Sequence, residues 1–291
     1  MDQEVETEQL LRQLIADIGT ENVELPAFPE VVNRLQLLLA DSNVPMKDVA
    51  ALIQSDPVLT AKLLRTANAA AFNTRGIEID NLNVALNRLG VTLVRSIAVA
   101  FAMRQAEQEP YLAAIKEELR EILRRSNYVA AIACATARRL PEVNADQAIL
   151  AGLVHQIGTL YLMITVQRDH PSLTEHLDYA ETVERLGNEA GAAVLRAWEF
   201  PPEICDAVRM QDQLLAAEKP DDFELEAMGK LLSAAKIRDR IEHDPTVHAV
   251  HPDVNGVLEN VSFDEHNFMD VLAASHSEIR DIQESLNTNL A

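Results

Sequence analysis

The stretch DPVLTAKLLRTANAAAF, residues 56–72, has the features of a helix with a defined start and one apolar face. Asp56 is a good N-cap, and Pro57 suits the first helical position because the N–H group there has no intrahelical partner. Leu59 and Leu63 then follow about one helical turn apart. The stretch therefore predicts an α-helix that buries one of its sides.

The same periodicity continues through most of the chain and predicts a series of further helices. A break is expected at Gly90, which should stop a short helix over 82–90, and residues 75–81 are expected to form a loop. Tyr111 to Leu140 is expected to form one long helix, or two helices joined near Ser126. The other helices are predicted over 29–41 (with Pro29 near the first turn), 44–55, 91–109, 144–158, Ser172–Leu186, Glu189–Trp198, Pro202–Leu215, Phe223–Ile241 and His266–Leu286.

No convincing run of alternating strand residues and no strict repeat of 20–50 residues is present, so the predicted fold class is all-α. Pro110 interrupts the acidic segment QAEQEPYL, and we place a boundary between two packed helical subdomains there. The predicted organisation is an N-terminal helix in 1–24, one subdomain over 25–110 and a second over 111–291. An exposed turn is expected at Glu218–Asp222, and His243–Ser262 is expected to be the longest irregular loop.

The composition favours a soluble globular protein that acts in the cytoplasm. The net charge of −21 should repel nucleic-acid backbones and anionic membranes. Cys134 and Cys205 show no CxxC spacing and are interpreted as reduced core thiols. The acidic N-terminus is unlike a signal peptide, and no apolar run is judged to approach the ~20 residues of a membrane span.

Four segments occur in the order seen in one known family: LPAFPEVVNRL (25–35), LIQSDPVLTAKLLRTANAAAF (52–72), ALNRLG (85–90) and AGLVHQIG (151–158). Over about Leu25 to Gln213 the chain resembles the HDOD family, the HD-related output domains of bacterial signalling. The resemblance implies two helical subdomains. It also implies that the second is similar to the catalytic HD phosphohydrolases, usually without their activity.

The segment AGLVHQIG carries a histidine followed by an amide, His155-Gln156, where an HD phosphohydrolase has His-Asp. In those enzymes, histidines and the aspartate hold a divalent metal that generates hydroxide from bound water. Gln156 offers a neutral oxygen, which is a poor replacement for a carboxylate that neutralises metal charge. His155 is therefore interpreted as a hydrogen-bonded histidine at a helix end, with no metal or other cofactor.

The resemblance places the remaining HD positions at Arg125, Gly187 and the pair Gln211-Asp212. No histidine lies within two residues of these positions, and Asp212 is the only further ligand type. We interpret the set as a vestigial HD site without catalytic or metal-binding residues. Gly152 and Gly158 are better explained by close helix packing or a helix end than by chemistry.

Other candidates for chemistry are weaker. His243, His248 and His251 are interpreted as solvated loop histidines rather than zinc ligands. His266 and His276 are expected on one helix, roughly 15 Å apart and too distant to share an ion. The sequence contains no P-loop, GxGxxG, GxSxG or HExxH motif.

Asn68 is a polar residue beside small ones on an apolar helix. We expect it, with Asp56, Pro57 and Phe72, to fix the junction between the subdomains by bonding a neighbouring loop.

Two functions from different classes follow. The leading one is a noncatalytic signal-transduction module that binds protein partners in bacterial signalling, with homo-oligomers possible. The alternative is a metal-dependent phosphohydrolase with a degenerate site, acting on nucleotides or cyclic dinucleotides. The number of convergent His and Asp ligands separates the two and favours the first.

Overall fold

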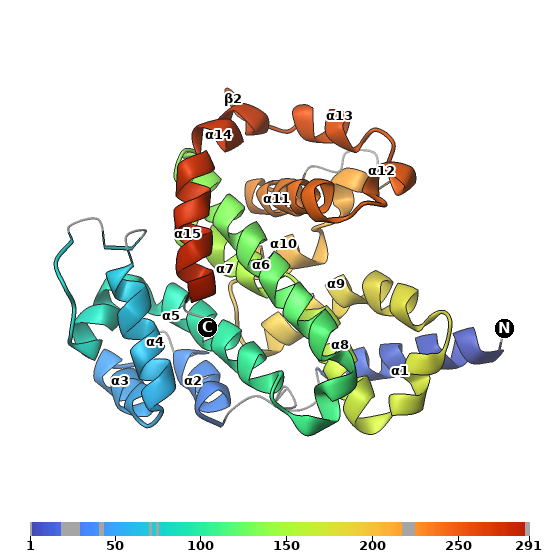
Figure 1. Cartoon of the computed structure of the whole chain (residues 1–291), viewed down its shortest axis with the longest axis horizontal. Coiled ribbons are helices and arrows are strands. Elements are labelled where there is room, and N and C mark those ends of the chain that lie inside the picture. The colour runs from blue at the N-terminus through green and yellow to red at the C-terminus, as the bar shows by residue number, and fades with distance from the viewer. Residues whose placement is uncertain are drawn as a thin grey trace.

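The structure, a computed structural model, describes residues 2–18, 30–40, 44–69, 72–73, 76–216 and 225–288. These residues are almost entirely helical, so the all-α fold class is confirmed (Figure 1). The elements are α1 (Asp2–Asp17), α2 (Glu30–Ala40), α3 (Met46–Gln54), α4 (Pro57–Asn68), α5 (Leu82–Ala106), η1 (Pro110–Ile115), α6 (Lys116–Ala137), α7 (Ala145–Val154), α8 (Ile157–Asp169), η2 (Pro171–Glu175), α9 (Tyr179–Ala197), α10 (Pro202–Arg209), η3 (Gln213–Leu215), α11 (Ala227–His243), α12 (Val247–Val250), α13 (Val254–Glu259), β1 (Ser262–Phe263), β2 (His266–Asn267), α14 (Phe268–Ala274) and α15 (His276–Thr288).

Helices α2 to α4 pack around α5 as one helical group. Helix α4 begins as predicted, because Asp56 Oδ1 accepts hydrogen bonds from the backbone N–H groups of Val58 and Leu59, each at 2.9 Å. Pro57 is its first residue, and the predicted apolar positions Leu59 and Leu63 are buried. The predicted position of Pro29 lies outside the described residues.

Helix α5 is broken but not ended at Gly90. Gly90 has φ of 74° and ψ of 161°, a conformation that suits glycine, and the helix resumes at the next residue and continues to Ala106. The sequence correctly predicted an interruption there, but not that both halves would form one bent element. The half after Gly90 is mostly buried and packs against α7, so α5 connects the N-terminal group to the rest of the molecule.

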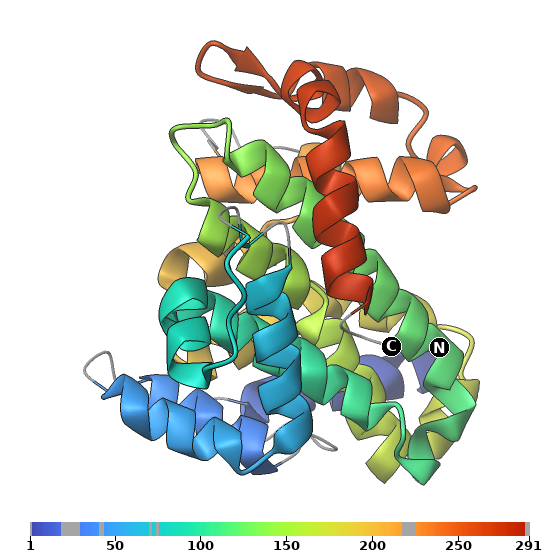
Figure 2. The same cartoon turned by 60° about the vertical axis from the view of Figure 1, so that its left-hand side comes forward.

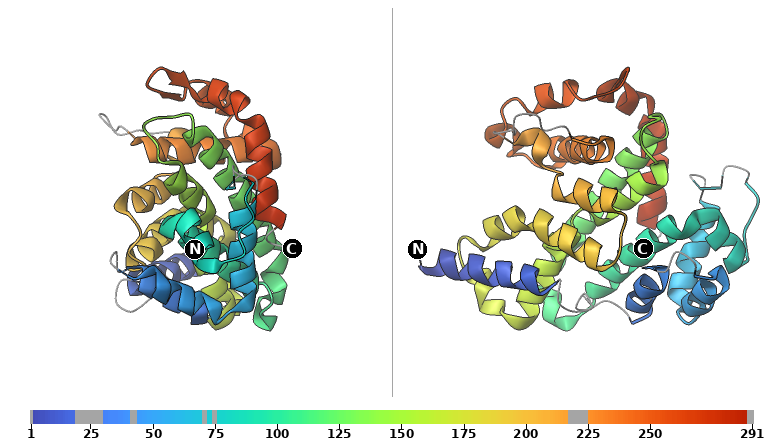
Figure 3. Two further views of the ribbon diagram at one scale, coloured as in Figure 1. Left: turned by 90° about the vertical axis from the view of Figure 1, so that its left-hand side faces the viewer. Right: turned by 180° about the vertical axis from the view of Figure 1, so that it is seen from behind.

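Helices α6 to α10 form the central layer of the protein (Figures 1 and 3). Pro110 starts the 3₁₀ turn η1, and α6 then runs past Ser126 without a break, so the alternative of one long helix is the correct one. The prediction of two helices joined near Gly187 was wrong, because α9 is continuous from Tyr179 to Ala197. Gly187 lies inside α9, where it gives room to Thr159 of α8.

The small residues of the central layer allow unusually close helix contacts. An added Cβ at Gly152 would lie 2.4 Å from Ala130 Cα, and one at Gly158 would lie 2.1 Å from both Gly187 O and Gly191 N. These distances are far inside van der Waals contact. The interpretation of Gly152 and Gly158 as packing residues is therefore confirmed.

The C-terminal part is more structured than the sequence suggested (Figure 2). His243–Ser262, predicted as a loop, contains α12 and α13, which bury Val247, Val254 and Leu258. The single helix predicted over His266–Leu286 was also wrong: it is strand β2 followed by α14 and α15. The expected turn at Glu218–Asp222 lies outside the described residues.

Helix α1 packs on α9, away from α2 to α4. Arg185 of α9 donates to Glu8 at 3.1 Å, and the hydroxyl of Thr7 lies 3.1 Å from His176 Nδ1. The N-terminal helix therefore belongs with the second subdomain rather than with the segment that follows it.

Two stretches, Leu82–Ala106 and Ala145–Asp169, are by length and composition apolar enough to cross a membrane. The prediction that no run approaches that length was thus too strict. In the structure 61% and 78% of the respective apolar windows are buried inside the protein, as expected for core helices.

Lys62 of α4 is a buried cation whose charge destabilises the folded state at low pH. It is 6% exposed, and its ammonium lies 5.9 Å from the centre of the Phe101 ring. Burial, aided by the charges of Arg104 and Arg65, lowers its pKa to about 7 from an ordinary value near 10.5. The folded state therefore carries a destabilising charge below pH 7.

We expect Lys62→Met to raise the free energy of unfolding by ~2–4 kcal/mol at pH 6, since one pKa unit corresponds to about 1.4 kcal/mol. Between pH 7 and 10.5 the native protein releases this proton while the unfolded chain keeps it, so wild-type stability rises with pH there. The gain from the substitution should shrink accordingly. Urea denaturation of both proteins at pH 6, 7.5 and 9 measures this, and a difference independent of pH would contradict it.

Candidate functional site

His155 is the residue that caps the C-terminal end of α7, and it is 3% exposed. Its Nδ1 lies 2.7 Å from the carbonyl oxygen of Gly152, so Nδ1 is the nitrogen that donates. Burial, followed by the charge of Lys236, lowers the pKa of His155 to about 3. The ring is neutral at physiological pH and serves as a buried hydrogen-bonding group. Gln156 follows at the start of α8 and is half-buried.

Amide side chains occupy the space next to His155. Gln211, which is 1% exposed, donates from Nε2 to the carbonyl oxygen of His155 at 2.9 Å and to Asn188 Oδ1 at 2.7 Å. Asn188 in turn donates to Asp212 at 2.7 Å. Gln211 therefore fixes the position of the α7 end through neutral hydrogen bonds.

The carboxylate of Asp212 is paired with a cation. Lys236 of α11 places its ammonium 2.8 Å from Asp212, and the two charges compensate each other. A divalent ion at Asp212 would have to displace this ammonium.

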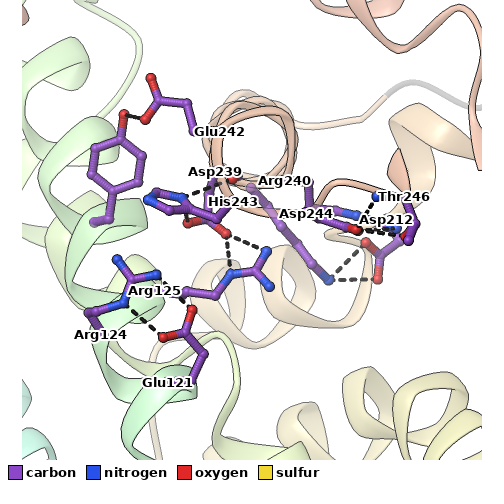
Figure 4. A network of polar contacts seen from close by, with 12 residues as sticks. Glu121, Arg124, Arg125, Asp212, Asp239, Arg240, Glu242, His243, Asp244 and Thr246 are labelled. Atoms are coloured by element: carbon purple, nitrogen blue, oxygen red, sulfur yellow. Dashed lines mark hydrogen bonds and ion pairs between the residues drawn. The ribbon is translucent and has the colours of Figure 1, made fainter. Parts of the chain in front are cut away.

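A second ion pair joins α6 to α11 (Figure 4). Both Nε and one terminal nitrogen of Arg125 lie 2.7 Å from Asp239 Oδ2, while the other oxygen of Asp239 is 3.0 Å from His243 Nδ1. Asp239 is only 3% exposed. The guanidinium of Arg125 thus neutralises a buried carboxylate and holds two helices together.

The vestigial HD set is only partly brought together. His155, Gln211 and Asp212 are connected through hydrogen bonds, but Gly187 carries no side chain and its neighbour Asn188 makes the contact instead. Arg125 acts on His155 through its charge alone. Within the described ranges no three His, Cys, Asp or Glu side chains are close enough together to hold a metal ion.

The donor set therefore does not fit a catalytic divalent metal. The imidazole of His155 is neutral, and the carboxylate of Asp212 is already bound to the ammonium of Lys236. The other side chains of the set are amides and the guanidinium of Arg125, whereas metal sites need several convergent anionic or imidazole ligands.

The interpretation of the loop histidines needs correction. His243 is the last residue of α11, where its ring contacts Tyr128 edge-on with ring centres 5.3 Å apart. His248 lies on the short helix α12 and His251 follows it. His266 and His276 are on a strand and a separate helix, because Asn267 caps the start of α14.

Asn68 does bond a loop, as predicted. Its side chain donates to the carbonyl oxygen of Ile79 at 2.7 Å and accepts from the N–H of Ile79 at 2.8 Å. This loop lies between α4 and α5, so the bond is inside the N-terminal subdomain rather than at the junction with the second. Asp56 caps α4 in the same subdomain, and Phe72 packs half-buried against the core.

Arg95 of α5 is the polar residue at the junction, and the sequence analysis missed it. It is 6% exposed and donates to the carbonyl oxygens of Gln36, Trp198 and Glu199 at 3.2 to 3.4 Å. Its guanidinium lies 4.5 Å from the ring centre of Phe200, and burial lowers its pKa to about 10. The sequence feature that could have identified it is an arginine inside the apolar run VTLVRSIAVAFAM.

The Arg95 junction has unfilled hydrogen-bonding capacity. Among the described residues, Arg95 Nε and both polar side-chain atoms of Gln36 are buried without a hydrogen-bond partner. Burying polar atoms without hydrogen bonds costs free energy. These atoms therefore weaken the contact between the two subdomains around Arg95.

Comparison with known proteins agrees with this architecture. The sequence model of the HDOD domain matches residues 25–214. An uncharacterised protein of Treponema pallidum is 23% identical over 241 residues, which cover 75% of this chain and 43% of that protein. The chain thus spans less than half the length of this curated relative.

Solved structures cover nearly the whole chain. A protein of Shewanella amazonensis, described as a candidate metal-dependent phosphohydrolase, is 27% identical with a TM-score of 0.67 and covers 98% of this chain and 100% of its own. An HDOD domain protein of unknown function from Geobacter sulfurreducens is 24% identical, with a TM-score of 0.57 and coverage of 97% and 99%. A candidate signal-transduction protein of Marinobacter aquaeolei is 20% identical, with a TM-score of 0.52 and coverage of 96% and 66%.

Proposed function

Because the chain belongs to the HDOD family, we propose that it is a noncatalytic signal-transduction module that acts by binding a protein partner. A regulatory or HD-related role agrees with the family match and with the signal-transduction and phosphohydrolase descriptions of its structural neighbours. The noncatalytic character and the protein partner are the proposed part.

The observation that carries the proposal is that Asp212 and Asp239 are each paired with a cation. Asp212 is paired with Lys236 and Asp239 with Arg125, each at 2.7 or 2.8 Å. These ion pairs engage both carboxylates with cations and link α11 to the turn after α10 and to α6. The vestigial site thus serves the packing of the second subdomain.

Transmission of a signal would then depend on how the two subdomains pack. Arg95 reaches from α5 to α2 and to the turn before α10, so a partner that moved one group would strain these bonds. The unpaired buried atoms of Gln36 and Arg95 lower the cost of such a rearrangement.

The second candidate function is hydrolysis of a nucleotide or cyclic dinucleotide at a degenerate site. It is favoured by the retained His155 and by the description of the similar Shewanella protein. The described donor set supports it less well, because Gln156 and Gln211 supply amides in place of charged ligands.

We further propose a cytoplasmic protein that binds neither nucleic acid nor membranes, on the basis of its net charge of −21. Homo-oligomers are compatible with this proposal.

Restoring the carboxylate at position 156 should not restore an enzyme. We expect Gln156→Asp to fold, to bind manganese and zinc no more tightly than wild type, and to stay inactive. The physical reason is that Asp212 and Asp239 are already paired with Lys236 and Arg125, so the new carboxylate and the neutral imidazole of His155 would be too few free ligands to hold a divalent ion. The charge of Arg125 is already taken up by Asp239, so it is not available to pair with the new carboxylate.

The measurement is calorimetric titration of Gln156→Asp, beside wild type and Gln156→Asn, together with a general phosphodiesterase assay. Gln156→Asn keeps the amide and controls for the shorter side chain. Tight one-to-one binding by Gln156→Asp alone would show that the supporting ligands are present.

A further inference from the structure

A groove lies between the N-terminal subdomain and the C-terminal helix α15. Figure 2 shows α4 and α15, whose residues line it, side by side. Its volume is about 720 Å³. One wall is formed by the C-terminal half of α4 and the described residues Ala69, Asn73, Gly76 and Glu78, and the other by α15. The lining residues used below are Leu64, Arg65, Glu78, Asp281, Glu284 and Ser285.

The charge of the groove is predominantly negative. Glu78 on one wall and Asp281 and Glu284 on the other are exposed, and no ion pair within the described ranges involves any of the three. The last turn of α4 also lines the groove, and the negative end of its helix dipole adds to the attraction for a cation. Arg65 is the single cation among the lining residues that the structure describes.

The floor of the groove is partly apolar. Leu64 contributes a half-buried side chain to it, and Ile77, in the adjoining loop, is 62% exposed. The three carboxylates do not form a cluster that could hold a metal ion within the described ranges. A ligand that meets all of them must therefore carry several separate positive groups as well as apolar ones.

We propose that this groove binds a basic amphipathic segment of a partner protein, with Lys or Arg side chains on Glu78, Asp281 and Glu284. This rests on the proposed function and specifies its partner. A second copy of this chain is disfavoured as the occupant, because its net charge of −21 repels an acidic groove. Nucleic acid is disfavoured for the same reason.

Binding in the groove also offers a way to change the protein's state. The segment would contact α4 and Glu78 on one side and α15 on the other. Helix α15 is fixed to α6 through the hydrogen bond from Asn127 to Asn287, and to the residues just after α6 through the ion pair of Arg139 with Glu278. Occupancy would therefore favour one arrangement of the N-terminal subdomain relative to α6.

The test uses a fluorescein-labelled 16-residue peptide of leucine and lysine arranged as an amphipathic helix, and a matched peptide with glutamate in place of lysine. Fluorescence anisotropy at physiological salt gives the Kd for wild type, for Asp281→Lys/Glu284→Lys and for Glu259→Lys/Glu265→Lys. The last variant makes the same change in net charge on exposed carboxylates near the hairpin, away from the groove lining. Circular dichroism confirms that each variant folds.

We expect the lysine peptide to bind wild type, the groove variant to weaken binding by about tenfold or more, and the control variant to weaken it by less than about threefold. Arg65→Ala should strengthen binding. Equal losses in the two charge-reversed variants, or no binding to wild type, would overturn the proposal. Displacement of the peptide by an equimolar amount of spermine would also overturn it, because the groove would then take free polyamines.

These outcomes are independent of the vestigial HD site. A hydrolytic activity that required His155 would refute the proposed function without changing the peptide affinities. Failure of the peptide test would leave the noncatalytic assignment in place.

Discussion

Gly158→Ala should be the most damaging single-methyl substitution in the central layer, with a loss of more than ~3 kcal/mol in the free energy of unfolding. The added Cβ would lie 2.1 Å from Gly187 O, 2.1 Å from Gly191 N and 2.6 Å from Gly191 Cα. All three are backbone atoms of α9, so no side-chain rotation relieves the contact. Helices α8 and α9 would have to move apart along their shared surface.

Gly191→Ala is the matched control, because it adds the same methyl group to the other side of this contact. There the nearest atom is a side-chain methyl of Val208 at 3.1 Å, followed by Gly158 N at 3.4 Å. We expect a loss of about 1 kcal/mol or less. Thermal unfolding of the two variants beside wild type measures the difference, and equal effects would show that α8 and α9 do not approach as closely as described.

Arg125→Ala should lower the free energy of unfolding by ~3–5 kcal/mol, because it leaves the buried carboxylate of Asp239 without its guanidinium. Asp239 is 3% exposed, and its other oxygen would keep only the contact with His243 Nδ1 at 3.0 Å. Arg124→Ala is the control on the same helix. Arg124 pairs with Glu121 at the surface, where both side chains are more than 40% exposed, and such a pair contributes about 0.5 kcal/mol or less.

A double variant separates charge from packing at this position. Arg125→Met/Asp239→Leu removes both charges and should recover most of the stability lost in Arg125→Ala, since an apolar replacement of a buried pair is often neutral or stabilising. Urea denaturation of the four proteins gives the comparison. If Arg125→Ala cost no more than Arg124→Ala, the ion pair would not hold α6 to α11.

Structural features that depend only on residues close together in the sequence could be predicted. The cap by Asp56, the start at Pro57 and the interruption at Gly90 follow from local backbone chemistry. The continuous helix α9 was missed because Gly187 looks like a helix end locally. Its role is set by α8, which packs against it.

Long-range partners account for most of what was missed in the candidate site. Asp239 is 114 residues from Arg125, and Arg95 is more than 100 residues from the carbonyl groups it binds near Trp198. A single sequence contains no periodic or local signal for such pairs. The amides at positions 156 and 211 were visible from residue types alone, whereas the ion pairs of Asp212 and Asp239 were not.

In the C-terminal part, too, local sequence pattern did not predict the elements correctly. The amphipathic pattern over His266–Leu286 was read as one helix, but Asn267 caps a new helix after a two-stranded hairpin. The hairpin buries Phe263, and this contact outweighs local helix preference.

The most direct test of the central claim is the metal content and activity of protein purified without chelator, beside His155→Ala. We expect no stoichiometric manganese, iron, nickel or zinc in either protein by elemental analysis, and no phosphodiesterase turnover. The reason is that Lys236 and Arg125 already neutralise the carboxylates of Asp212 and Asp239. One equivalent of metal in wild type that is lost in His155→Ala, accompanied by turnover, would contradict the account.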